Sequence, residues 1–250
     1  MNDDRASRVR SLIATLDDPD HIEAEEARFA LTDDSGSDRL EPLLAAAPSF
    51  ARFGELMAIE VLHAVGDRRA VPILRRWLSS NDDIVRQNSA ELLGELGATE
   101  AIDDLRAALA AASARGTPPD WSEPVAMRRA LARLGGRSVV IPTEIAPLSA
   151  DGPWDFAWRL SDLCVVLDGL AAASQVVMCF QIWAFENPGG STSWYRRPGG
   201  RSMSIDWGEP WEQLVAESHR QATSACEALD VNIDAIATVE WIDRADLDPS

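Results

Sequence analysis

Three short windows of this chain share one pattern and follow one another at a constant spacing. They read ARFAL at residues 27–31, AIEVL at 58–62 and SAELL at 89–93, so each step is 31 residues. Each window begins with a small residue, ends in leucine and lies where apolar residues recur at helical spacing. A period of this length built from paired helices is typical of an α-solenoid, in which neighbouring units stack to bury their apolar faces. The N-terminal half is therefore predicted to be an all-α solenoid.

The clearest unit spans residues 67–97. It predicts a short helix with Pro72 near its start, a polar turn, and a longer helix that ends at Gly97. Glycine suits the left-handed conformation in which many helices end. We expect Arg86, at the start of the second helix, to pair with nearby aspartates or with a neighbouring unit rather than to bind a ligand.

Three motifs in this unit carry a resemblance to a known family. They are AVP at 70–72, the elbow DDxxR at 82–86 and the run AELLGELG at 90–97. On these motifs the unit resembles a HEAT-like repeat of the short type also found in phycobilisome lyase proteins. The resemblance implies about four helix pairs over the first 135 residues and says little about function. It extends to three further stretches, at 38–66, 98–135 and 6–34.

The chain is strongly acidic. It has 41 Asp and Glu residues against 23 Lys and Arg, which gives a net charge of −18. One interpretation of this charge is that it keeps the protein soluble. A more specific interpretation is that it attracts a basic partner. The densest basic cluster comprises Arg68, Arg69, Arg75 and Arg76. Acidic residues surround it, so we predict a solvent-exposed face there and no nucleic acid as a partner. Arg75 and Arg76 are retained as candidate partner-binding residues.

The cysteines and the apolar segments indicate in which cellular compartment the protein is expected. Cys164, Cys179 and Cys226 are isolated and form no CxxC pair, so we predict buried free thiols without a disulfide, metal site or cofactor. No apolar run approaches the ~20 residues that span a bilayer, so a membrane is not a predicted partner. The N-terminus lacks an apolar signal segment, and a cytoplasmic location is expected.

The amino-acid composition changes after residue 136. Seven of the nine tryptophans lie in the stretch from Trp154 to Trp241. We predict a helical domain at 1–136, a linker at 137–150 and a Trp-rich α+β domain at 151–250. Alternation and helical spacing predict a β-α-β-β-α-β order in the last of these, which matches the ferredoxin-like plan. The expected elements are strands at 154–160, 175–185, 201–207 and 236–242 and helices at 161–174 and 209–229.

Two Pro-Gly-Gly sequences, at 188–190 and 198–200, are interpreted as turns that bracket a projecting arm at 191–197. Aromatic and arginine residues on such an arm have the composition of interaction hot spots. The alternative is a hairpin whose Trp194 folds back onto the sheet. The candidate partner-binding residues of the arm are Trp194, Tyr195, Arg196 and Arg197.

No arrangement of residues predicts catalysis. His219 has no serine or cysteine nucleophile at a recognisable spacing, and neither Pro-Gly-Gly sequence fits a phosphate-binding loop. The leading hypothesis is a non-enzymatic adaptor that binds another protein, in its sharpest form an acidic inhibitor or immunity-type protein that acts on a basic partner. The alternative is a small-molecule-binding protein or accessory enzyme subunit with a ligand pocket in the C-terminal domain.

Overall fold

The chain divides into two compact units, residues 1–138 and 139–250. The structure is a computed structural model that describes residues 2–33, 39–136, 141–150, 156–186, 193–229 and 235–247. The side chains of residues 2, 3, 185, 186, 193–195 and 198 lie outside this description.

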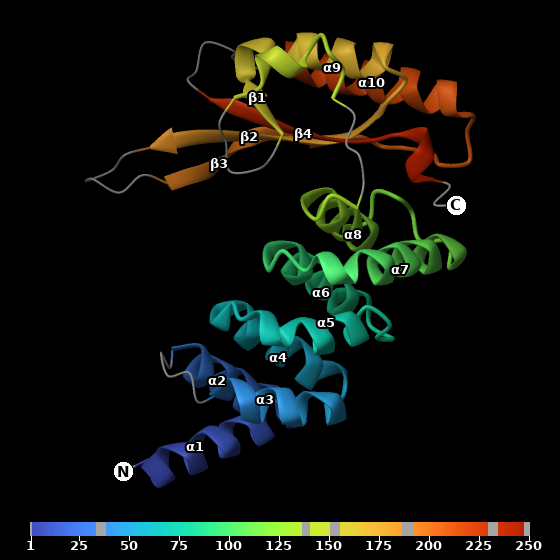
Figure 1. Cartoon of the computed structure of the whole chain (residues 1–250). Helices are drawn as coiled ribbons and strands as arrows, with labels where there is room; N and C mark the ends of the chain where they lie inside the picture. Colours follow the sequence, from blue (N-terminus) through green and yellow to red (C-terminus); the bar gives the residue numbers. More distant parts are fainter. Residues whose placement is uncertain are drawn as a thin grey trace. The chain divides into compact units, whose positions relative to one another are not determined.

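The first unit is all-helical, and its helices form antiparallel pairs (Figure 1). Short 3-10 turns precede α4, α5 and α7, at Ala47–Ser49, Arg68–Ala70 and Thr99–Ala101. The helices are α1 (Asn2–Thr15), α2 (His21–Asp33), α3 (Leu40–Ala46), α4 (Arg52–Val65), α5 (Val71–Trp77), α6 (Asp83–Glu95), α7 (Ile102–Ala114) and α8 (Ser122–Arg133).

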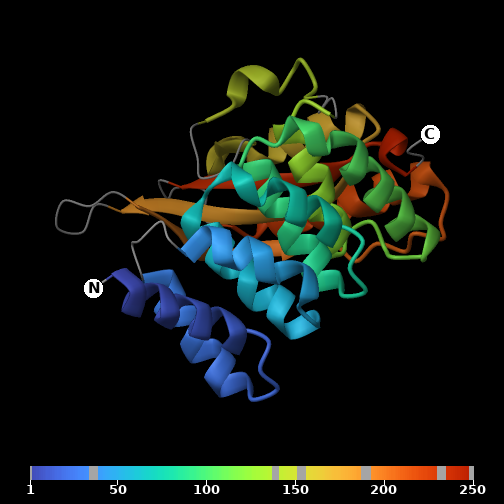
Figure 2. The same cartoon turned by 60° about the horizontal axis from the view of Figure 1, so that its bottom comes forward.

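The second helix of each pair packs against the second helix of the next, so α2, α4, α6 and α8 form one row. Figure 2 shows the same stacking from a second direction. The three repeated windows lie in α2, α4 and α6 and supply this packing, which confirms the predicted solenoid. Their first and last residues are all buried, namely Ala27, Ala58, Ser89, Leu31, Leu62 and Leu93.

Two glycines in the third pair have roles that other residues fill poorly. Gly97, which follows α6, has a φ of 63°, as the sequence predicted for the end of this helix. Gly94 lies where α6 approaches α8, and a Cβ there would come within 3.0 Å of the Ala130 Cα. The α6–α8 contact therefore depends on the absence of a side chain at position 94.

The second unit is an α+β fold, as predicted. Its sheet is antiparallel with the strand order β1-β4-β2-β3, and α9 and α10 cover one face of it (Figure 1). The elements are β1 (Ala157–Arg159), α9 (Leu163–Ala172), β2 (Val176–Glu186), β3 (Ser193–Ser202), α10 (Trp211–Glu227) and β4 (Ile236–Ile242), with 3-10 turns at Ala146–Leu148, Leu160–Asp162 and Arg244–Asp246.

Each helix of this unit connects two strands that have another strand between them. The β1-α9-β2 connection encloses β4, and the β3-α10-β4 connection encloses β2. This is the split β-α-β arrangement that the sequence predicted. The strand order differs from the ferredoxin-like plan, in which the first and third strands are central. In this sheet the central strands are β2 and β4. The core lies between the sheet and the two helices and includes Trp158, Phe180 and Leu167. Ile145, from the segment preceding β1, is also fully buried in it.

The second Pro-Gly-Gly sequence is not a turn, and this prediction is wrong. Residues 198–200 lie inside β3, where the register with β2 shifts between Phe180 and Ile182. Glycine provides the same conformational freedom in a β-bulge as in a turn. The Pro-Gly-Gly composition alone therefore did not distinguish a bulge from a turn. The strand predicted at 201–207 instead ends at Ser202. The first Pro-Gly-Gly sequence, at 188–190, lies outside the described residues.

The prediction of free thiols is wrong for two of the three cysteines. Cys164 on α9 and Cys226 on α10 form a disulfide, with their Cα atoms 6.2 Å apart. Cys179 is free. The two helices pack side by side on the sheet and bring together residues that are 62 positions apart in the sequence. No local motif indicates this pairing, because it arises only from the tertiary packing of α9 against α10.

Candidate interaction surface

A groove of about 410 Å³ crosses α2, α4 and α6, the row of second helices in the first unit. The repeat spacing places Phe29, Glu60 and Glu91 at equivalent positions of the three helices. A stacked array of this kind therefore presents one side chain per repeat along a line. The groove is lined by Arg28, Thr32, Ile59, Glu60, His63, Ala64, Asn88, Glu91, Leu92 and Glu95.

The charges that line this groove are mostly negative. One arginine, Arg28, faces three glutamates, and its guanidinium lies 2.7 Å from Glu60 on α4. His63 Nε2 lies 2.9 Å from a carboxylate oxygen of Glu95. Glu91 accepts a hydrogen bond of 3.1 Å from the amide of Gln87, a neutral partner. The groove, which we call the acidic groove, thus keeps an excess of negative charge after its internal pairs are formed.

An exposed aromatic side chain, that of Phe29, contacts Arg28, which lines the acidic groove. Phe29 is 56% exposed, and the Arg28 guanidinium carbon lies 3.8 Å from the centroid of its ring. Ile22, also on α2, is 70% exposed. Aromatic and arginine side chains that stand together on a surface are enriched at the centres of protein interfaces.

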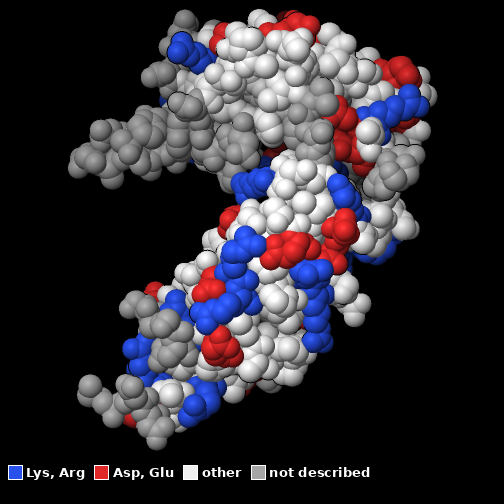
Figure 3. All heavy atoms as spheres, in the orientation of Figure 1, with Lys and Arg blue, Asp and Glu red and all other residues white. Residues whose placement is uncertain are grey.

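Figure 3 shows acidic and basic side chains interspersed on the displayed face of the helical unit, without a broad field of one sign. On this face, neither sign of charge forms a continuous patch. Exposed charges separated by more than ~8–10 Å are largely screened at physiological salt, so the groups within one groove matter most to a partner seated there.

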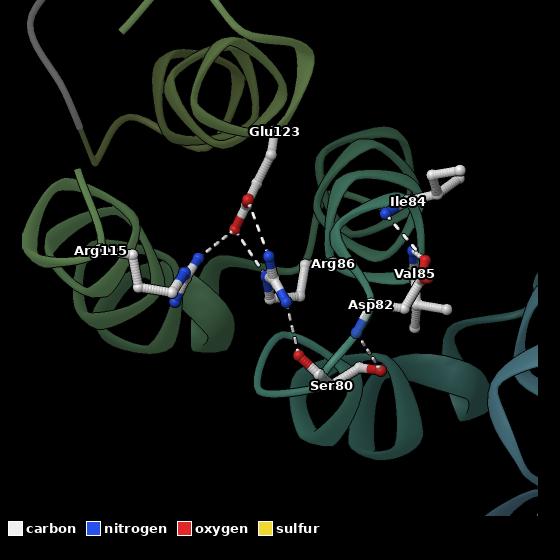
Figure 4. Close-up of polar contacts among 7 residues, drawn as sticks. All are labelled: Ser80, Asp82, Ile84, Val85, Arg86, Arg115 and Glu123. Atoms are coloured by element: carbon white, nitrogen blue, oxygen red, sulfur yellow. Dashed lines mark hydrogen bonds and ion pairs between the residues drawn. The ribbon is translucent and has the colours of Figure 1, made fainter. Parts of the chain in front are cut away.

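Arg86 has the structural role that the sequence predicted, and its partner lies in the next repeat. Its Nε and Nη2 donate to the two carboxylate oxygens of Glu123 on α8, at 2.6 and 2.9 Å, and its Nη1 donates to the Ser80 carbonyl oxygen at 2.7 Å (Figure 4). Arg115, at the end of α7, donates to the same carboxylate at 2.6 Å. The hydrogen bond with Glu123 raises the pKa of Arg86. This junction joins α6 to α8.

Asp82 caps α6 and does not pair with Arg86. Its carboxylate accepts hydrogen bonds of 3.0 Å from the backbone N–H groups of Ile84 and Val85 (Figure 4). It also forms an ion pair with Arg52 of α4. A carboxylate at this position satisfies N–H groups that have no partner within the helix and interacts favourably with the helix dipole.

Arg75 and Arg76, two of the sequence-predicted site residues, lie on α5, a first helix, and do not line the acidic groove. Arg75 pairs with Asp104 of α7, and Arg76 Nη2 donates to the Pro48 carbonyl oxygen at 3.2 Å. Both side chains therefore contact neighbouring repeats. Arg75 also lines a separate pocket of about 500 Å³ next to α7.

The four candidate residues of the arm lie on β3, at one end of the sheet order. Arg196 pairs in register with Trp183 and Arg197 with Ile182, both on β2. Arg196 is exposed and Arg197 is half-buried. Trp194 and Tyr195 belong to the strand, but their side chains lie outside the described part of the structure. The structure thus places the arginines on a sheet edge and leaves the aromatic pair untested.

The second unit offers a pocket of about 360 Å³ beside α10, lined in part by Asp206, Glu209 and Glu217. His219 is not among its lining residues. His219 Nε2 lies 2.8 Å from a carboxylate oxygen of Asp168 on α9, so this histidine joins the two helices. Glu217 hydrogen-bonds Arg220, which lowers the pKa of the Glu217 carboxyl.

The described residues contain neither a metal-binding cluster nor a membrane-crossing helix. They include no group of three or more His, Cys, Asp or Glu side chains that could hold a metal ion. No described helix is both long and apolar enough to cross a membrane.

The comparisons with known proteins concern the helical half. A family model for HEAT repeats matches residues 41–117, the stretch from α3 through α7. HEAT repeats are commonly protein-interaction motifs and are generally non-enzymatic. No curated protein matches the chain. The acidic groove was missed by sequence reasoning, although Glu60 and Glu91 share one position in the 31-residue repeat and could have revealed it.

Proposed function

Since the N-terminal half of this chain is a HEAT-like repeat unit, we propose that the protein is a non-enzymatic adaptor that binds a basic segment of another protein. The acidic groove is the proposed binding surface. Its excess of carboxylates is the observation that carries the proposal, because they lie side by side on successive repeats. Carboxylates in such an array bind arginine and lysine side chains and exclude acidic partners.

The spacing of the groove sets the spacing of a partner. The axes of packed helices lie roughly 8–10 Å apart, so we expect Glu60 and Glu91 to repeat at about that distance across the row. A polyproline II segment rises about 3.1 Å per residue with three residues per turn, so basic residues three positions apart lie on one face and match successive glutamates. An apolar residue three positions before them would meet Phe29, which is exposed at the equivalent position of α2.

A labelled synthetic peptide with one leucine followed by arginines at every third position tests this proposal. We expect it to bind the wild-type protein with an affinity that falls as the salt concentration rises, because exposed charge pairs are screened. The double variant Glu60→Gln, Glu91→Gln should bind it about tenfold more weakly, since each exposed pair contributes roughly 0.2–1 kcal/mol. Fluorescence anisotropy measures both effects.

A charge-matched control variant distinguishes an effect of the groove on peptide binding from an effect of the overall charge of the protein. The variant Glu41→Gln, Asp103→Asn removes two exposed carboxylates that do not line the acidic groove. It should bind the peptide within about twofold of wild type. Equal losses in both double variants would contradict binding in the groove and leave only a nonspecific effect of net charge.

The sharper form of the proposal is an inhibitor or immunity-type protein that covers a basic surface of its target. Electrostatic complementarity acts mainly on the association rate. A captured partner that is basic and associates more slowly at high salt supports this form, and an acidic or neutral partner contradicts it.

Two further expectations belong to the same proposal. We propose that Arg196 and Arg197, with Trp194 and Tyr195, make a second contact from the edge of the sheet. We also propose a cytoplasmic location, where the disulfide between Cys164 and Cys226 would be unusual because disulfides are rare in the cytosol.

A further inference from the structure

A second concave site lies on the helical unit, formed by α5, the turn that follows it and α7. Its volume is about 500 Å³, within the range of small-ligand sites. Apart from Asp104, the wall provided by α7 consists of Ala107, Ala108 and Ala111, whose small side chains leave the space open. None of its lining residues lines the acidic groove.

Positive charge is concentrated in this pocket, in contrast to the rest of the acidic chain. Three arginines line it against one carboxylate, that of Asp104. Glu123 lies behind the pocket and pairs with Arg86 and Arg115, so the three arginines and their two carboxylate partners leave one net positive charge. A pocket with this balance attracts an anion by its local field.

The three guanidinium groups differ in how many donors they have left for a ligand. Arg86 is fixed by Glu123 and the Ser80 carbonyl oxygen and is 8% exposed. Arg75 and Arg115 are each more than 40% exposed, and each uses one nitrogen for an ion pair, with Asp104 and Glu123 respectively. Among the described residues, their other N–H groups make no hydrogen bond.

From this arrangement we infer that the pocket binds a phosphoryl group between Arg75 and Arg115. A guanidinium presents its N–H donors in a fork that matches two oxygens of a phosphate. A phosphate monoester has three terminal oxygens and carries more negative charge than a carboxylate, so it accepts from guanidinium forks on both sides. Asn81, an exposed lining residue, places an amide donor at the same rim.

The phosphoryl group can come from a phosphorylated side chain of a partner protein or from a small phosphate ester, and the chemistry of recognition is shared. This site is independent of the proposed acidic groove, because the two have no lining residue in common. Loss of binding at one would leave the other unchanged.

An NMR titration with inorganic phosphate, at constant ionic strength and with chloride as the reference anion, tests the inference. We expect phosphate, and not chloride, to shift the backbone amide signals of Ala107, Ala108 and Ala111 in a saturable way. The variants Arg75→Gln and Arg115→Gln should each weaken this binding about tenfold, as loss of a charge-assisted hydrogen bond does. Arg76→Gln, one residue away and outside the pocket, should change it less than twofold.

Titrations with a phosphoserine peptide and with glycerol phosphate distinguish the two sources. A peptide that binds at least tenfold more tightly than glycerol phosphate indicates a phosphorylated partner, and equal affinities indicate a small ester. The inference is overturned if phosphate and chloride give the same shifts, or if Arg75→Gln and Arg115→Gln bind phosphate as well as Arg76→Gln does.

Discussion

Replacing Glu123 by glutamine tests how the third and fourth helix pairs are held together. In wild type the carboxylate receives two hydrogen bonds from Arg86 and one from Arg115. The side chains of Glu123 and Arg86 are only 5% and 10% exposed, so the variant leaves a buried guanidinium without a countercharge. Removing one member of a buried pair costs about 3–5 kcal/mol. We expect a value near the lower end, about 3 kcal/mol, because the Ser80 carbonyl still accepts one hydrogen bond.

Native-state hydrogen exchange measured by mass spectrometry is a suitable assay, because it assigns an opening free energy to peptides from α6 and α8 without requiring both units to unfold together. Arg115→Gln is the matched control, since this arginine is 43% exposed and its loss should cost less than about 1 kcal/mol. The paired variant Arg86→Met, Glu123→Leu should recover most of the loss, because it buries no unpaired charge. A cost below about 1 kcal/mol for Glu123→Gln would refute the view that this junction holds α6 against α8.

Three further outcomes are expected. The variant Cys164→Ser opens a cross-link over 62 residues, and the second unit should lose about 4 kcal/mol of unfolding free energy in urea titrations; equal stability with and without reductant would contradict the disulfide. The Arg69 hydrogen bond lowers the pKa of the Asp67 carboxyl to about 2, so its contribution to stability is present above pH 3.8 and is lost as pH falls toward 2. An NMR titration should show this, and Arg69→Ala should move the pKa toward 3.8, whereas an unchanged value would exclude that cause. Gly94→Val should destabilise α6 by about 1–3 kcal/mol in the exchange assay because its Cβ meets Ala130, and a neutral effect would show that the helices separate easily.

The helical half could be predicted because its contacts are periodic and near in sequence. Buried positions repeat with the helix pairs, and the cap at Asp82 and the left-handed Gly97 are local signals. The partner of Arg86 could not be identified in this way. Glu123 lies 37 residues away, beyond the α7–α8 connection, and nothing local marks it as the acceptor.

The second unit shows where local patterns stop being informative. The β-α-β-β-α-β order follows from alternation and helical spacing, but the strand order depends on long-range pairing between β2 and β4. The disulfide likewise depends on the packing of α9 against α10. For the binding surfaces, composition gave only the sign of the overall charge, whereas the acidic groove and the arginine pocket require the stacking of separate helices to form.

A charge exchange between the groove and its ligand tests the central claim most directly. The variant Glu60→Arg, Glu91→Arg should lose affinity for the arginine peptide and gain affinity for a peptide in which those arginines are glutamates. Circular dichroism of the variant confirms that its helices are intact. The proposed adaptor function predicts that binding recovers only in the matched pairs of protein and peptide. Equal binding of both peptides by both proteins would show that a basic partner is not recognised in the acidic groove.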